Sequence, residues 1–103
     1  MAAVVQAAAA FSLLPALAWA QSKAPAAAQM CSTCHGANGL STIPNAPNLA
    51  GQPALYIAEQ MKAYRSGKRS HEVMNVVAKP LSDADIDTLA AWYASIKIEV
   101  KVP

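Results

Sequence analysis

Two cysteines and a histidine lie within five consecutive residues and form the most reactive group in the sequence. Cys31 and Cys34 are three positions apart, and His35 follows the second directly. This spacing is that of c-type haem attachment, because two thiols on one helical turn can each add across one vinyl group of the same porphyrin. The histidine behind them can then donate a ring nitrogen to the iron. The sequence therefore predicts one covalently attached haem c with His35 as an axial ligand.

The same residues permit three other sites, each with a weakness. A disulfide between Cys31 and Cys34 would close too short a loop to stabilise the chain much. A thiol-disulfide oxidoreductase of the thioredoxin kind would need a strand before the cysteines and a helix after them, whereas turn-forming residues follow. Zinc prefers four ligands, so a zinc site would need both cysteines and both histidines of the chain, His35 and the distant His71, with none to spare. These weaknesses favour haem and leave the oxidoreductase as the alternative from the enzyme class.

Residues 1–20 are expected to be a cleaved secretory signal peptide. Residues 7–17 are an apolar run, and Ala18-Trp19-Ala20 supplies the small residues that precede a cleavage site before Gln21. The usual positive charge at the start is missing, which leaves a start upstream of Met1 open. A retained anchor or a buried helix is the alternative, but the run is interrupted and shorter than the ~20 apolar residues that span a bilayer. Export to the bacterial periplasm, an oxidising compartment, is therefore expected.

The remaining residues, 21–103, are expected to form one small domain. The chain has 103 residues and a formal net charge of +2, too slight a charge to indicate nucleic-acid binding. No integral membrane span is expected in the mature chain. A domain of this size usually needs a disulfide, a metal or a cofactor to complete its core. The composition thus agrees with a bound haem.

Three helices joined by long loops are expected to position the reactive residues. The first is a short helix from residue 21 to 28, with Pro25 in its first turn, that leads to the cysteines. The second covers about residues 53–66, where apolar residues recur at spacings of three and four. The third follows the capping sequence at residues 82–85. The turn-rich stretch 36–51 and the stretch 68–80 are expected to be irregular.

Four motifs resemble the class I c-type cytochromes. Within that family the chain is most similar to the small bacterial cytochromes of the c-four and c-five kind, over about Ala26 to Lys97. Relatives of the c-four kind carry two haem domains, whereas this chain has one attachment motif. The resemblance implies an all-α class I cytochrome c fold, with three main helices around one haem. The motifs are Cys31-Ser32-Thr33-Cys34-His35-Gly36, Pro47-Asn48-Leu49-Ala50-Gly51-Gln52, Arg65-Ser66-Gly67-Lys68-Arg69 with Met74, and Leu81-Ser82-Asp83-Ala84-Asp85-Ile86.

The resemblance also implies roles for two residues of the long loop. The carbonyl of Pro47 would accept a hydrogen bond from the second ring nitrogen of His35, which orients the imidazole and raises its basicity. Leu49 would lie against the haem face. The alternative for Pro47 is an ordinary loop proline, since prolines are common in loops.

The second axial ligand has four candidates. Met30 adjoins Cys31 on the same side of the haem as His35, Met61 belongs to the apolar stripe of a helix, and His71 stands among charged residues. Met74 lies in the irregular stretch between the two later helices, where the resemblance also places the ligating methionine. A His/Met pair fills both axial positions and gives iron a relatively high reduction potential, which suits electron transfer.

These features predict a periplasmic one-electron carrier, not an enzyme, that exchanges electrons with redox partner proteins. The alternative is a haem subunit of a larger dehydrogenase or oxidase complex, with peripheral association to a membrane oxidoreductase. Arg65 or Arg69 is a candidate contact for a haem propionate. A dipolar surface that steers docking is expected if the basic cluster lies apart from the acidic one. The two clusters are Lys62, Arg65, Lys68 and Arg69, and Asp83, Asp85 and Asp87.

Overall fold

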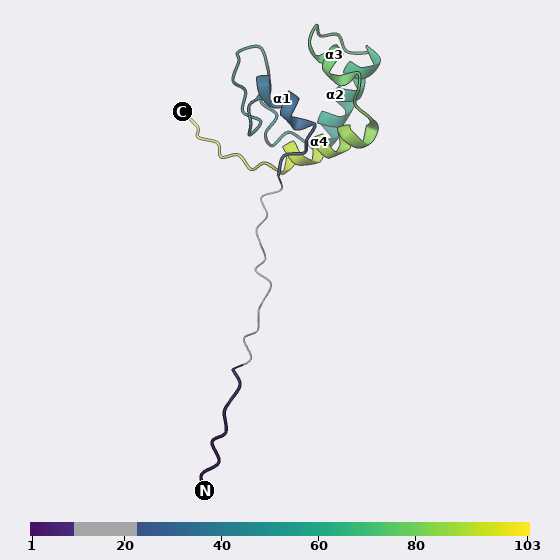
Figure 1. The fold of residues 1–103 in the computed structure, drawn as a ribbon. Coiled ribbons are helices and arrows are strands. Elements are labelled where there is room, and N and C mark those ends of the chain that lie inside the picture. Colours follow the sequence, from purple (N-terminus) through teal and green to yellow (C-terminus); the bar gives the residue numbers. More distant parts are fainter. Residues whose placement is uncertain (10–22) are drawn as a thin grey trace.

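In the part of the chain that the structure describes, four helices joined by long loops make up the fold (Figure 1). The computed structural model describes residues 1–9 and 23–103, and within these residues it contains no strand, so the predicted all-α class is confirmed. α1 faces α2 and α3, and α4 runs beneath them in Figure 1. Of the described helices, none is long and apolar enough to cross a membrane. Residues 10–20 of the expected signal peptide lie outside the described residues.

The first helix begins later than expected and includes the cysteines. α1 spans Ala28–His35, whereas a helix starting at Gln21 was predicted; residues 21 and 22 lie outside the described part. Pro25 precedes α1 instead of occupying its first turn, and its carbonyl accepts a hydrogen bond from the Ala28 N–H at 2.9 Å. That turn directs the chain into the helix. Both cysteines and His35 therefore stand on helical backbone.

The two longer helices begin and end at the predicted signals. α2 spans Ala54–Ser66, with Pro53 before it and Gly67 after it in the left-handed conformation at φ 82°. α4 spans Asp83–Ser95 and begins with a reciprocal capping box: Ser82 accepts from the Asp85 N–H, and the Asp85 carboxylate accepts from the Ser82 N–H. The cap satisfies two N–H groups that have no partner within the helix. Both predictions are confirmed.

A short helix interrupts the stretch that was expected to be irregular. α3 spans Met74–Ala78, so the prediction for residues 68–80 was wrong over these five residues. Val76 and Val77 have low helix propensity, and five residues are too few for a helix that is stable by itself. α3 packs against α2. Contacts with the rest of the molecule therefore decide this element.

A small core joins α1, α2 and α4. Its buried members form one cluster, to which α1 contributes Ala28, α2 contributes Ile57, and α4 contributes Leu89, Ala90 and Tyr93. α2 packs against α4 as well as against α3. Two of the five are alanines, so the apolar area that they bury is modest. This agrees with a domain whose core is completed by a bound group.

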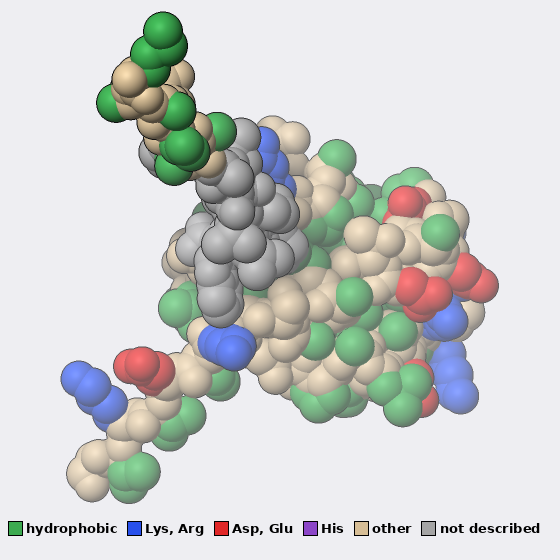
Figure 2. Space-filling model, turned by 90° about the horizontal axis from the view of Figure 1, so that it is seen from below, with side chains coloured by type: hydrophobic (Ala, Val, Ile, Leu, Met, Phe, Trp, Pro, Cys, Tyr) green, Lys and Arg blue, Asp and Glu red, His purple; other side chains and the backbone are tan. Residues whose placement is uncertain are grey.

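Two basic side chains of α2 lie beside the first acidic residue of α4, so the expected dipolar separation was wrong for these residues. Arg65 on α2 forms an ion pair with Asp83 on α4 and donates a second hydrogen bond, at 2.9 Å, to the Leu81 carbonyl. The charge of Lys62 also acts on Asp83. Figure 2 shows Lys and Arg beside Asp and Glu at one end of the molecule. Helix packing places Lys62 and Arg65 next to Asp83, and the guanidinium of Arg65 is bonded to residues at the start of α4.

Candidate functional site

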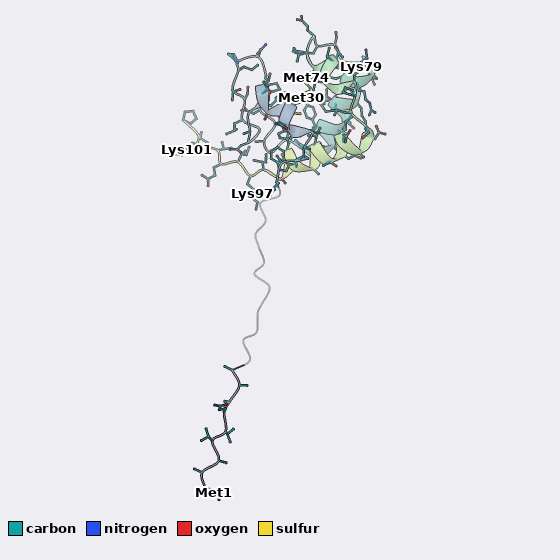
Figure 3. All side chains as sticks on the ribbon, in the orientation of Figure 1. Met1, Met30, Met74, Lys79, Lys97 and Lys101 are labelled. Carbon is teal, nitrogen blue, oxygen red and sulfur yellow. The ribbon has the colours of Figure 1, made fainter. Side chains whose placement is uncertain are left out.

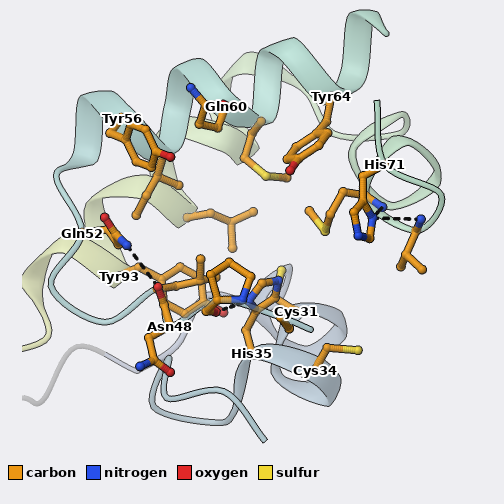
Figure 4. A pocket seen from close by; sticks show the side chains of 18 of the residues that line it. Cys31, Cys34, His35, Asn48, Gln52, Tyr56, Gln60, Tyr64, His71 and Tyr93 are labelled. Atoms are coloured by element: carbon orange, nitrogen blue, oxygen red, sulfur yellow. Dashed lines mark hydrogen bonds between the residues drawn. The ribbon is translucent and has the colours of Figure 1, made fainter. Parts of the chain in front are cut away.

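All six predicted site residues line one cleft between α1 and the α2–α3 pair (Figure 4). The cleft has a volume of about 330 Å³, and its lining is mostly apolar. α2 and α4 supply much of the remaining wall. The six residues are Cys31, Cys34, His35, Pro47, Leu49 and Met74. The fold therefore brings together residues that are spread over 44 positions of the sequence, from 31 to 74.

His35 is buried and held in one orientation by the long loop. Its ring is 7% exposed, and its Nδ1 lies 2.8 Å from the Pro47 carbonyl oxygen. A carbonyl only accepts, so Nδ1 carries the hydrogen and donates it. In the neutral imidazole, Nε2 is then the unprotonated nitrogen that can bind a metal. This is the hydrogen bond that the resemblance implied for Pro47.

The two cysteines are half-buried free thiols on α1. The Cys31 Sγ lies 3.6 Å from the Ala27 carbonyl oxygen, and burial raises the pKa of this thiol. Three residues of helix separate the two sulfurs by nearly one turn, so both project on the side of the cleft. Their environment keeps Cys31 as a protonated thiol rather than a thiolate.

A glycine directly behind His35 lets the loop turn back across the cleft. Gly36 has φ 79° and ψ 154°, a combination that is open almost only to glycine. A Cβ at this position would lie 1.8 Å from the Leu40 carbonyl oxygen. The turn carries the chain toward Pro47, whose carbonyl meets the imidazole. Gly36 is thus a requirement of the site that the attachment motif alone does not contain.

Main-chain hydrogen bonds fix the loop that carries Pro47 and Leu49. The Gly39 carbonyl accepts from the Leu49 N–H at 2.8 Å and from the Ala50 N–H at 3.0 Å. The Asn48 side chain accepts from the Ser41 N–H at 2.7 Å. These bonds join the two ends of the loop. Leu49 packs against the buried core cluster while also lining the cleft.

Two methionines line the cleft, and they differ in what surrounds them. Met61 on α2 packs against the buried core cluster, as an ordinary core methionine does. Met74 opens α3 and is half-buried. Met30, on α1, is 51% exposed; Figure 3 shows Met30 and Met74 on their separate helices. Met74 is the thioether that has no part in the core.

His71 and Arg69 have contacts that the sequence did not reveal. His71 is exposed, as expected, but its Nδ1 accepts from the N–H groups of Val73 and Met74 at 3.2 Å each, which caps α3. Its ring meets the Tyr64 ring edge-to-face at 6.3 Å. The Arg69 guanidinium lies over the ring of the same Tyr64, 4.7 Å from its centroid, and donates a hydrogen bond to the Gln60 side chain. Arg69 also lines the cleft, whereas Arg65 is engaged by α4.

A buried tyrosine hydroxyl faces the same region. Tyr93 is 1% exposed, and its Oη lies close enough to the Cys31 thiol to interact with it. Burial, with the neighbouring Cys31 thiol, raises the pKa of Tyr93. The cost of burying a hydroxyl falls when a polar neighbour faces it. Tyr93 and Cys31 thus form a buried polar pair in the wall of the cleft.

The donor set of the cleft fits haem c. Two thiols, an imidazole with a free Nε2 and a thioether line an apolar space. Thiols attach the vinyl groups, while imidazole and thioether are the axial ligands found together in cytochromes c. Among the described residues no group of three or more His, Cys, Asp or Glu could hold a metal ion directly. The residues suit an iron that arrives within a porphyrin.

Comparison with known proteins decides the family. The family model described as cytochrome c matches residues 20–97. The chain belongs to the cytochrome c family. As in that family, it binds haem c covalently, and both the predicted cofactor and the predicted class I fold are confirmed.

Relatives and a solved structure support the likeness to the c-four kind. The chain is 42% identical over 93 residues to the thiosulfate dehydrogenase electron acceptor of Thiomonas intermedia, which covers 85% of this chain and 43% of that protein. It is 44% identical over 68 residues to cytochrome c-554(548) of Halomonas halodenitrificans, covering 63% of this chain and 82% of that one. The cytochrome c4 structure of Acidithiobacillus ferrooxidans superimposes with a TM-score of 0.62 at 35% identity, covering 64% and 38% of the two chains. The chain thus spans less than half of the first relative's length.

Proposed function

We propose that this protein is a periplasmic one-electron carrier whose haem iron is bound between His35 and Met74. The observation that carries the proposal is the orientation of His35. Its Nδ1–H is donated to the Pro47 carbonyl, which leaves Nε2 available in a cleft that also holds both thiols and Met74. When bound, haem c supplies an iron that gains or loses a single electron.

Cys31 and Cys34 would attach the porphyrin through thioether bonds. Each thiol adds across one vinyl group, so its hydrogen goes to the vinyl carbon and no oxidant is needed. The two sulfurs stand on α1 at the edge of the cleft, directly before the axial histidine. Burial of Cys31 favours the protonated thiol, which protects it from oxidation before attachment.

Met74 is the second axial ligand in this proposal. Met61 already packs in the core, where its side chain contributes apolar contacts, whereas Met74 lines the cleft from a short helix. His71 also lines the cleft, but its Nδ1 accepts from two N–H groups, so in the neutral ring Nε2 carries the hydrogen and cannot bind iron. With both axial positions filled by protein, no site remains for a substrate, which supports a carrier rather than an enzyme.

Replacing each cleft methionine tests the assignment. Met74→Ala should keep the haem attached but abolish the weak sulfur-to-iron charge-transfer band of the oxidised protein. The reduction potential should fall by a sizeable part of the ~0.8 V that axial ligation tunes. Met61→Leu is the control, because a volume-conserving core substitution should leave both readouts nearly unchanged. Loss of the band in Met61→Leu and its retention in Met74→Ala would reverse the assignment.

As a second candidate function, we propose that the protein is the haem subunit of a dehydrogenase complex. It is favoured by the relative from Thiomonas intermedia that is named a thiosulfate dehydrogenase electron acceptor. Affinity purification of the tagged protein from its native periplasm tests this: a stoichiometric dehydrogenase would support a subunit, and a haem protein that elutes alone would support a free carrier. A denaturing gel stained for haem separates both from a dithiol oxidoreductase, which would retain no haem.

A further inference from the structure

The residue after Met74 connects the start of α3 to the end of α2. The Asn75 side chain donates from Nδ2 to the Tyr64 and Arg69 carbonyls, at 2.8 Å each, and its Oδ1 accepts from the His71 N–H at 2.7 Å. Two carbonyls accept and one N–H donates, so only one orientation of the amide satisfies all three partners. We call this arrangement the Asn75 clamp.

A second set of hydrogen bonds, from His71, acts with the clamp to restrain the backbone at Met74. The His71 Nδ1 accepts from the Met74 N–H at 3.2 Å, and the His71 carbonyl accepts from the Asn75 N–H at 3.1 Å. The Met74 backbone is therefore bonded to His71 on one side and is followed by the anchored Asn75 on the other. α3 also packs against α2, but it has only five residues and is preceded by Val73, whose side chain cannot cap it, so its own helical hydrogen bonds are few.

A methionine on so short an element needs such restraints if its sulfur is to stay at one place. Two partners of the clamp are the Tyr64 carbonyl in the last turn of α2 and the Arg69 carbonyl just after it, and α2 packs against α4 in the core. Through the clamp, the start of α3 and therefore Met74 are fixed to the end of α2. Hydrogen bonds from side chains lock the geometry of metal ligands in the same way.

We propose that Asn75 is a positioning residue that holds Met74 at the iron. The inference rests on the proposed axial role of Met74. It concerns the distal ligand only, since no bond of the clamp reaches α1 or the loop that carries Pro47. Without the clamp, the sulfur would leave the iron more often, and external ligands would enter the open position.

Two substitutions at the same site separate the donor and acceptor bonds of the amide. Asn75→Asp has the same size and keeps the acceptor for the His71 N–H, but a carboxylate cannot donate to the Tyr64 and Arg69 carbonyls. Asn75→Ala removes all three bonds. We expect Asn75→Ala holoprotein to lose most of the sulfur-to-iron charge-transfer band and to bind cyanide roughly tenfold faster or more, as expected for the loss of at least one hydrogen bond's stabilisation. Asn75→Asp should change both readouts in the same direction at least as much, because one carboxylate oxygen would face the Tyr64 and Arg69 carbonyl oxygens without a hydrogen to donate.

Matched controls identify the cause of any change. Asn38→Asp adds the same charge at an exposed position far from the clamp and should match the wild type. Ile86→Val truncates a side chain that is 0% exposed in α4 and lowers stability without touching the clamp, so it should keep the band and the cyanide rate. Equal losses in Ile86→Val would show a general stability effect and overturn the proposal.

The remaining outcomes also decide the matter. Wild-type band and cyanide rate in both Asn75 variants would overturn the positioning role, and so would failure of both variants to yield folded holoprotein. If Asn75→Ala alone does not accumulate, Asn75→Asp decides. Retention of the band in Met74→Ala would instead overturn the ligand assignment, so the two failures are distinguishable.

Discussion

The two sides of the haem cleft are held by different kinds of hydrogen bonds. On the His35 side the restraints come largely from the main chain: the Pro47 carbonyl accepts from the imidazole, and the Gly39 carbonyl accepts from two N–H groups of the same loop. On the Met74 side they come from the side chains of His71 and Asn75. Main-chain bonds survive most substitutions, whereas side-chain bonds depend on one residue type. Substitutions around His35 should therefore disturb the position of this ligand less than substitutions around Met74 disturb the position of the other.

The difference follows from how far apart the parts lie in the sequence. The two attachment cysteines and the proximal ligand His35 lie within five consecutive residues, so one helix positions all three. The distal ligand lies on a separate short helix that must be fixed to α2 by long-range contacts. A local motif needs little support, and a remote ligand needs its own set of restraints.

The largest effect is expected when the haem cannot be attached, because both sides of the cleft then lose their ligand. The double substitution Cys31→Ser, Cys34→Ser should accumulate little folded protein, because the haem both crosslinks the chain and completes a small core. Helical content and denaturant unfolding of the purified product measure this. A cooperative unfolding transition of haem-free protein would contradict the prediction.

Disrupting the loop that orients His35 requires a change in its backbone conformation, and Gly36→Ala imposes such a change. The new Cβ would meet the Leu40 carbonyl oxygen at 1.8 Å on a backbone conformation that alanine rarely adopts. A loss of more than ~3 kcal/mol of unfolding free energy is expected. Gly67→Ala is the matched control: its φ is also positive at 82°, but no described atom lies within 4 Å of its Cβ, so only ~1–2 kcal/mol should be lost. Equal losses in the two variants would remove the special role of Gly36.

A side-chain change on the proximal side should have a mild effect. Pro47→Ala keeps the carbonyl that accepts from His35, and the loss of proline's restriction of the unfolded chain should cost about 0.4–1 kcal/mol. The imidazole N–H should remain slow to exchange with solvent, which proton NMR of the reduced holoprotein measures. Rapid exchange of that proton would show that the proline ring, and not the main chain alone, holds the histidine.

The smallest effect is expected at the ion pair outside the cleft. A hydrogen bond from Arg65, then its charge, holds the pKa of Asp83 below its usual value. A carboxylate with a lowered pKa stabilises the fold above its unfolded-state pKa, and that contribution is lost as the pH falls through the lowered value. Asp83→Asn should therefore melt slightly below the wild type at neutral pH and together with it in strong acid. A difference that grows on acidification would contradict this sign.

The local signals that bracket the two longer helices were reliable. α2 lies between Pro53 and Gly67, and α4 begins at the capping box of Ser82. Each of these signals acts on backbone N–H and C=O groups within a few residues of the helix end. The start of α1 was missed, since the carbonyl of Pro25 forms a turn before the helix rather than joining it. The separation of charges was also wrong, because sequence clusters on different helices can become neighbours.

By itself, the sequence determined the attachment chemistry: Cys31, Cys34 and His35 lie within five consecutive residues, so their relation follows from the geometry of little more than one helical turn. It also determined the two longer helices. Only the tertiary structure decided that α3 forms, that Arg65 is engaged by α4, and that Asn75 joins Met74 to the end of α2. The physical reason is that these features consist of hydrogen bonds between segments whose separation in space the chain alone does not specify. A five-residue helix has too few bonds of its own, so its place depends on the partners that the fold supplies.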